Sequence, residues 1–150
     1  SSGPKTPIGN SQRFDYYPNK IDIKYAKGFK VDYFKSYKVV SVFDNTDSGS
    51  LLQKLILVEQ GTRIPSHQPS DVIVRVPLTS VSCLSTSHVP YLKRLNQIET
   101  IAGIGNPDRV LDSVLNKQIK DGWTLGITRS GQLDVEKVLE SNTQLLMAYP

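Results

Sequence analysis

A polar cluster, Ser85-Thr86-Ser87-His88, holds the side chains whose types and spacing most directly suggest chemistry. It separates an apolar run that ends at Leu84 from a second apolar pattern that begins at Val89. Three hydroxyls, an imidazole and the unpaired backbone N–H groups of a helix start can together bind a polar or anionic ligand. A single hydroxyl that caps the helix, with its neighbours in water, explains the same residues. The four residues alone leave both interpretations open.

A second polar group, Thr128-Arg129-Ser130, closes the apolar segment that starts at Trp123. In an open α/β sheet, ligands bind beyond the carboxyl ends of the strands. Arg129 can pair with a carboxylate there, although an exposed loop arginine is usually solvated. We therefore expect both polar groups at one rim of a sheet, and the predicted ligand-binding residues are Ser85, Thr86, Ser87, His88, Thr128, Arg129 and Ser130.

Three further motifs give weaker signals. The stretch GIGNPDRV, residues 103–110, lacks the full spacing of a glycine-rich phosphate loop, so we interpret it as a tight strand-to-helix turn. His67 and His88 lie in different segments without a cysteine pair, so neither belongs to a local zinc-binding motif. Ser85, His88 and Asp134 have the residue types of a hydrolase triad, but no nucleophile-elbow motif surrounds the serine to support it.

The segment before residue 80 has the period of two that is typical of strands. Its first two predicted strands form a β-hairpin whose turn is at 26–28, and Pro77 indicates that the last strand is an edge or ends there. Residues 21–43 therefore predict an antiparallel meander. The predicted strands are 21–25, 29–33, 37–43 and 71–78. Residues 51–61 fit a buried strand or a short helix, and we favour a strand around 54–59.

Strands alternate with helices from residue 81 onward, which indicates a right-handed parallel sheet. Helices are predicted near 88–98, over 107–121 and after Asp134, and short strands within 98–105, 123–128 and 143–150. We expect the second helix to turn inward Val110, Leu111, Val114, Leu115 and Ile119. The expected fold class is α/β, a three-layer αβα lobe with a mostly parallel sheet plus an N-terminal antiparallel hairpin or meander.

The composition, with 38% hydrophobic and 21% charged residues, predicts a folded domain. The net charge of +4 resides in residues 1–40, which hold eight Lys/Arg and three Asp/Glu against ten and eleven in the rest. Cys83 is the single cysteine, so no internal disulfide forms and the redox compartment is not indicated. Residues 1–20 lack the apolar core of a signal peptide and predict a flexible leader or tether.

Three stretches resemble, in order, parts of one family. They are YAKGF with the tyrosine-rich hairpin after it, RVPLTSVSCLSTSHVPYLKRLNQIETIAGIG, and SGQLDVEKVLESNTQLLMAYP. Together they are similar to the N-terminal lobe of the substrate-binding proteins of bacterial ABC importers, of the TroA-like, class III periplasmic type. The resemblance spans roughly residues 24–150, and Asn142-Thr143 stands where the family often has Pro-Asp.

The resemblance implies that residues 21–150 form the N-terminal lobe of a two-lobe protein whose second lobe is absent from this chain. The implied function is non-enzymatic capture of an Fe(III)-siderophore, haem or cobalamin outside the cytoplasmic membrane and delivery to an ABC permease and its ATPase. No cofactor and no nucleic acid are implied, the location is periplasmic or extracytoplasmic, and a lipoprotein anchor would precede residue 1. Because both lobes would share the ligand, we expect weak binding by this chain, with residues 85–88 facing solvent.

Two other function classes fit parts of the sequence. Lysines alternate with aromatic residues over 24–38, which suits a nucleic-acid or partner surface. Strand alternation already explains them, because lysines are common on the solvent face and exposed edges of a meander. An α/β hydrolase-like enzyme is the third possibility. Salt-dependent binding of nucleic acid would favour the nucleic-acid surface, and hydrolysis that Ser85→Ala abolishes would favour the enzyme.

Overall fold

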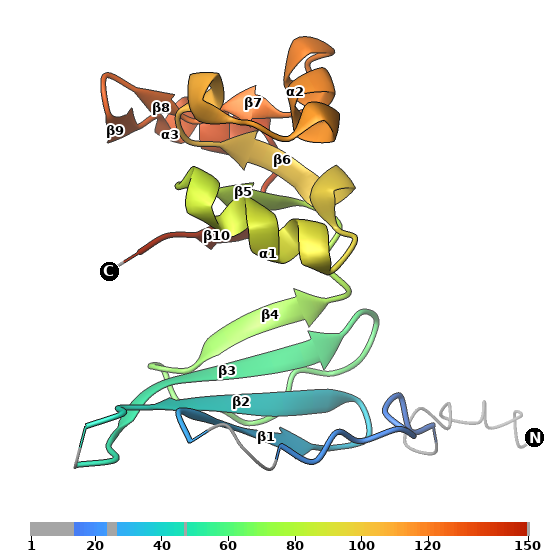
Figure 1. Cartoon of the computed structure of the whole chain (residues 1–150). Helices are drawn as coiled ribbons and strands as arrows, with labels where there is room; N and C mark the ends of the chain where they lie inside the picture. The colour runs from blue at the N-terminus through green and yellow to red at the C-terminus, as the bar shows by residue number, and fades with distance from the viewer. Residues whose placement is uncertain (1–13, 24–26, 47, 150) are drawn as a thin grey trace, which may run out of the picture. The chain divides into compact units, whose positions relative to one another are not determined.

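The computed structural model describes residues 14–23, 27–46 and 48–149 (Figure 1). The chain divides into two compact units, Ser1–Pro77 and Leu78–Pro150, called here the meander unit and the α/β unit. The division falls inside the single lobe expected over 21–150. The predicted leader lies partly outside the described residues, at 1–13, and its described part, 14–20, contains neither helix nor strand.

The meander unit is a four-stranded sheet in the order β1-β2-β3-β4 (Figure 1). The first three strands pair antiparallel, as predicted for the first two, and β4 adds to the sheet parallel to β3. Val39, Ile56 and Val58 form its buried core. The strands are β1 Phe29–Tyr33, β2 Tyr37–Phe43, β3 Leu51–Glu59 and β4 Val72–Val76, so β4 ends directly before Pro77 as the sequence predicts.

The hairpin of this unit differs from the predicted one. β1 pairs with β2 through the turn at residues 34–36, whereas residues 21–23 form no strand and 24–26 lie outside the described residues. Alternation therefore predicted the strand 29–33 and its antiparallel pairing with 37–43 correctly, but it also predicted a strand from residue 21 that residues 21–23 do not form. The physical reason is that alternation marks the two faces of a strand but not the neighbour with which it pairs.

The α/β unit contains a parallel sheet in the order β10-β5-β6-β7 and a short antiparallel pair, β8-β9. Its elements are β5 Val81–Cys83, the 3₁₀ turn η1 Thr86–His88, α1 Val89–Arg94, η2 Ile98–Thr100, β6 Ile101–Ile104, η3 Pro107–Arg109, α2 Ser113–Lys120, β7 Leu125–Gly126, β8 Thr128–Arg129, β9 Gln132–Leu133, α3 Val135–Glu140 and β10 Leu145–Met147. The predicted α/β class, with a parallel sheet after an N-terminal antiparallel meander, is confirmed.

A buried cluster joins the sheet to α1 and α2. Strand residues such as Ile101 and Ile104 pack there against Leu92 of α1 and Leu115 of α2. A buried threonine, Thr124, ties the start of β6 to α2 because its hydroxyl donates to the Ile101 carbonyl at 2.6 Å and accepts from the Gln118 side-chain amide at 3.1 Å. The third layer of the expected αβα lobe is not clearly formed, and α3 contains no buried residue.

The helix predicted over 107–121 is shorter in the structure. Asp112 caps α2 by accepting from the backbone N–H groups of Val114 and Leu115, so the helix starts at Ser113. Leu111 consequently precedes the helix and is 96% exposed, and Val114 is half exposed, although both were expected to face inward. Val110 and Leu115 are buried as predicted.

Two leucines four residues apart test the core assignment. Leu115→Ala is expected to destabilise the α/β unit by about 2–5 kcal/mol, because truncation leaves a cavity in the buried cluster. Leu111→Ala should change stability by less than about 0.5 kcal/mol because the side chain is exposed. Denaturant unfolding followed by far-ultraviolet circular dichroism measures both. Equal losses for the two variants would contradict the assignment.

Candidate functional site

The carboxyl ends of the parallel strands bring polar groups from four distant segments to one edge of the sheet. Ser85 follows β5, Asn106 follows β6, Thr128 follows β7 and Tyr149 follows β10. Hydroxyl and aromatic groups thus gather where loops leave a parallel sheet, the usual place of ligand sites in open α/β folds. The sequence predicted the first and third of these segments.

The Ser85-His88 segment is a capped 3₁₀ turn. The Ser85 hydroxyl accepts from the Ser87 backbone N–H at 3.3 Å, which confirms the cap interpretation for one hydroxyl. The Ser85 and Ser87 hydroxyls lie 2.7 Å apart, and the Ser87 hydroxyl lies 2.9 Å from the Tyr149 hydroxyl. A chain of three hydroxyls therefore runs along the sheet edge from β5 to the segment after β10.

His88 is not the solvent-facing group that the sequence predicted. Its side chain is buried, with the residue 6% exposed, and its Nδ1 lies 3.2 Å from the Ser85 carbonyl oxygen. The ring stacks on Tyr149 with a centroid separation of 4.6 Å and an interplanar angle of 20°. The expectation failed because the sequence does not reveal that Tyr149 returns to cover the start of α1.

The hypothetical catalytic triad of Ser85, His88 and Asp134 does not form among the described residues. His88 contacts the backbone carbonyl of Ser85, while the serine hydroxyl pairs with Ser87. Asp134 pairs instead with Arg129 at 2.9 Å. The contact between a nucleophile and its base that such chemistry needs is therefore not formed by these side chains.

Thr128 positions the loop that follows β6. Its hydroxyl accepts from the Asn106 backbone N–H at 3.1 Å, and Asn106 is left-handed, with φ 53°. Asparagine tolerates this conformation better than most residues do. Thr128 thereby fixes the start of η3, which carries Arg109.

Arg129 and Ser130, also predicted to contact ligand, have other structural roles. Arg129 is exposed, but its guanidinium is paired with Asp134, which also caps α3 by accepting from the Lys137 backbone N–H at 3.2 Å. Ser130 has a φ of 52° and forms, with Gly131, the turn between β8 and β9. Tertiary pairing and turn geometry thus account for both residues.

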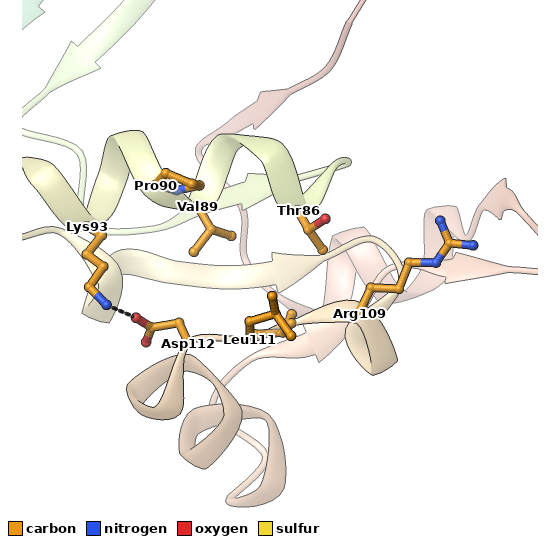
Figure 2. A pocket seen from close by; sticks show the side chains of 8 residues that line it. Thr86, Val89, Pro90, Lys93, Arg109, Leu111 and Asp112 are labelled. Atoms are coloured by element: carbon orange, nitrogen blue, oxygen red, sulfur yellow. Dashed lines mark hydrogen bonds and ion pairs between the residues drawn. The ribbon is translucent and has the colours of Figure 1, made fainter.

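A pocket of about 310 Å³ lies between α1 and the segment that joins η3 to α2. Figure 2 shows Thr86 and Arg109 at one end of it and the Lys93–Asp112 pair at the other, with apolar side chains between. Thr86 is the one predicted site residue in its lining. The complete lining is Thr86, Val89, Pro90, Lys93, Arg109, Val110, Leu111 and Asp112.

The charges in this pocket are unequal. Lys93 donates to Asp112 at 2.7 Å, and this hydrogen bond, with the backbone N–H groups at the start of α2, holds the pKa of the Asp112 carboxyl below its usual range. Arg109 makes no ion pair or side-chain hydrogen bond with any residue that the structure describes. The pocket therefore carries one uncompensated positive charge.

Sequence reasoning missed Asn106, Arg109 and Tyr149. The Asn106-Pro107 dipeptide after a glycine is a turn signal that could have marked the loop. Nothing local distinguishes Arg109 or Tyr149, because their surroundings come from segments far away in the chain.

Within the described residues, no group of three or more His, Cys, Asp and Glu side chains could hold a metal ion. No helix in that part of the chain is long and apolar enough to span a membrane.

Burial raises the pKa of the Cys83 thiol to about 11, so it is protonated and a poor nucleophile near neutral pH.

Comparison of the chain with models of protein families, with curated proteins and with solved structures finds no match.

Asp112 should make stability depend on pH. Because its folded pKa is lowered, its contribution is fully present above its unfolded pKa of about 4 and is lost as pH falls through the folded value. Asp112→Asn keeps a capping oxygen but removes this pH dependence, whereas Asp112→Ala should lose about 1–2 kcal/mol at pH 7. Denaturant midpoints between pH 7 and pH 2 measure both. An unchanged acid slope in Asp112→Asn would contradict the assignment.

The Thr128 hydroxyl should be needed for the position of the 106–109 loop. Thr128→Val removes the acceptor for the Asn106 N–H and should cost about 1 kcal/mol, whereas Thr128→Ser retains it. Amide NMR spectra should show shifts over 106–109 in the valine variant and little change there in the serine variant. Identical spectra of the two variants over these residues would overturn the positioning role.

Proposed function

We propose that the chain is the solute-binding component of an ABC importer and that its α/β unit contributes one wall of the ligand site. The ligand would be an Fe(III)-siderophore or a related metal chelate, such as haem or cobalamin, and the protein would act outside the cytoplasmic membrane. The observation that carries the proposal is the convergence of Ser87, Thr128 and Tyr149 at the carboxyl edge of a parallel sheet, beside the pocket at Arg109.

The side chains at this edge suit reversible binding. Hydroxyls can donate to or accept from the oxygen atoms that a metal chelate presents, and the exposed ring of Tyr149 offers an apolar face. A pocket of about 310 Å³ lies at the small end of ligand cavities, so it would bury only part of such a chelate. A second binding surface is then needed to exclude water from the rest, which supports the two-lobe arrangement that the sequence resemblance implies.

The basic hairpin gives less support to the nucleic-acid alternative. Lys30 pairs with Asp32 at 2.8 Å, and the Lys38 ammonium lies 5.0 Å from the centre of the Tyr17 ring. These lysines already have electrostatic partners within the meander unit, so they offer less charge to a phosphate backbone. We therefore retain ligand capture as the proposed function.

Calorimetric titration of the 150-residue chain with four probes tests this proposal. The probes are a ferric trihydroxamate, a ferric tricatecholate, haemin and cyanocobalamin. At least one should bind weakly and saturably, and Ser87→Ala should weaken that binding about two- to tenfold through loss of a hydroxyl at the rim. Ser48→Ala, a serine in the meander unit, is the matched control and should bind as the wild type does.

The location of the tryptophan decides the readout. Trp123 is 77% exposed and precedes β7, so it lies at the amino end of the strand and away from the proposed site. Its fluorescence should therefore respond little to the ligand, and calorimetry and thermal shift report binding. If none of the four probes produces saturable heat or raises the melting temperature, the transport proposal is wrong.

A further inference from the structure

Two polar groups without partners face the same end of the pocket. The Thr86 hydroxyl and the Arg109 guanidinium make no side-chain hydrogen bond or ion pair with any residue in the described part of the chain. They come from different elements, η1 and η3, yet Figure 2 shows both at the same end of the pocket lining. A ligand there can engage both without displacing an existing side-chain interaction.

The balance of charge determines which ligand suits this end of the pocket. Lys93 is neutralised by Asp112 within the pocket, and Arg129, the cation that the sequence favoured, is neutralised by Asp134. Asp108 neighbours Arg109 in η3 but is not among the residues that line the pocket. The guanidinium therefore presents an uncompensated charge and up to five N–H donors, a set that matches planar anionic oxygens.

The apolar part of the pocket adds a second requirement. Leu111 is 96% exposed beside Arg109, an unusual exposure for a leucine in a segment fixed by a helix cap on one side and a buried valine, Val110, on the other. Pro90 of α1 contributes a further apolar surface on the opposite wall. A ligand that covers Leu111 would remove this side chain from water, which is favourable.

We propose that this end of the pocket recognises an organic anion in which a carboxylate or catecholate group is joined directly to an apolar group. Arg109 and Thr86 bind the anionic oxygens, and Leu111 and Pro90 contact the apolar part. This inference rests on the proposed function and narrows it, because the chelate captured would carry such a group at its edge. Arg109, rather than Arg129, then determines the preference for an anionic ligand.

A metal-free probe tests the site directly. Sodium phenylacetate should shift the amide NMR signals of Thr86, Val110 and Leu111 in the full chain, and the neutral analogue phenylacetamide should shift them much less. Arg109→Gln should weaken phenylacetate binding about tenfold or more, the effect expected for a charge-assisted hydrogen bond. Arg94→Gln is the matched control, since Arg94 is an exposed arginine at the end of α1 outside the pocket lining. Equal shifts with acid and amide, or equal effects of the two variants, would overturn the inference.

Metal chelates separate this inference from the proposed function. A ferric tricatecholate, which is strongly anionic, should lose affinity in Arg109→Gln, whereas a neutral ferric trihydroxamate should not. If chelates bind and the two respond identically, the function stands and the anion preference falls. If no chelate binds but phenylacetate binding depends on Arg109, the anion site stands and the chelate function falls.

Discussion

The close approach of β5, β6 and the residue after β7 is the constraint on which the α/β unit depends. A Cβ atom at Gly103 would overlap the Ser82 hydroxyl and lie 2.7 Å from a methyl of Ile127, and one at Gly105 would overlap the Leu84 carbonyl oxygen. Glycine is the residue that leaves this space empty. The strands therefore meet closely enough for the loops beyond them to contact one another.

The candidate site follows from that approach in a short series of contacts. Gly105 is followed by Asn106, whose N–H reaches the Thr128 hydroxyl, and this bond sets the start of η3 and so the place of Arg109. Asp112 then ends the loop by capping α2 and pairing with Lys93 across the pocket. The hydrogen bond from Asn106 to Thr128 and the cap at Asp112 thus form the pocket, and Arg109, which lies between them, carries its one unpaired charge.

The predicted helix over 107–121 shows what apolar periodicity predicts about a helix and what it does not. Val110, Leu111, Val114 and Leu115 have the spacing of an apolar helical face, and the pattern alone does not say where the helix begins. The beginning depends on a capping carboxylate, and Asp112 occupies that place inside the predicted helix. The capping rule that correctly placed Asp134 before α3 would also have corrected this boundary, although it would not have shown that Leu111 is exposed while Val110 is buried.

By itself the sequence determined the features that depend on neighbours within a few residues: most of the alternating strands, the parallel α/β succession and the cap at Asp134. Only the tertiary structure decided which polar groups are available to a ligand. Tyr149 covers His88 from the far end of the unit, and Asp134 neutralises Arg129 while Arg109 has no such partner among the described residues. The physical reason is that hydrogen-bonding and rotational preferences act locally, whereas burial and charge balance depend on segments that only strand pairing brings together.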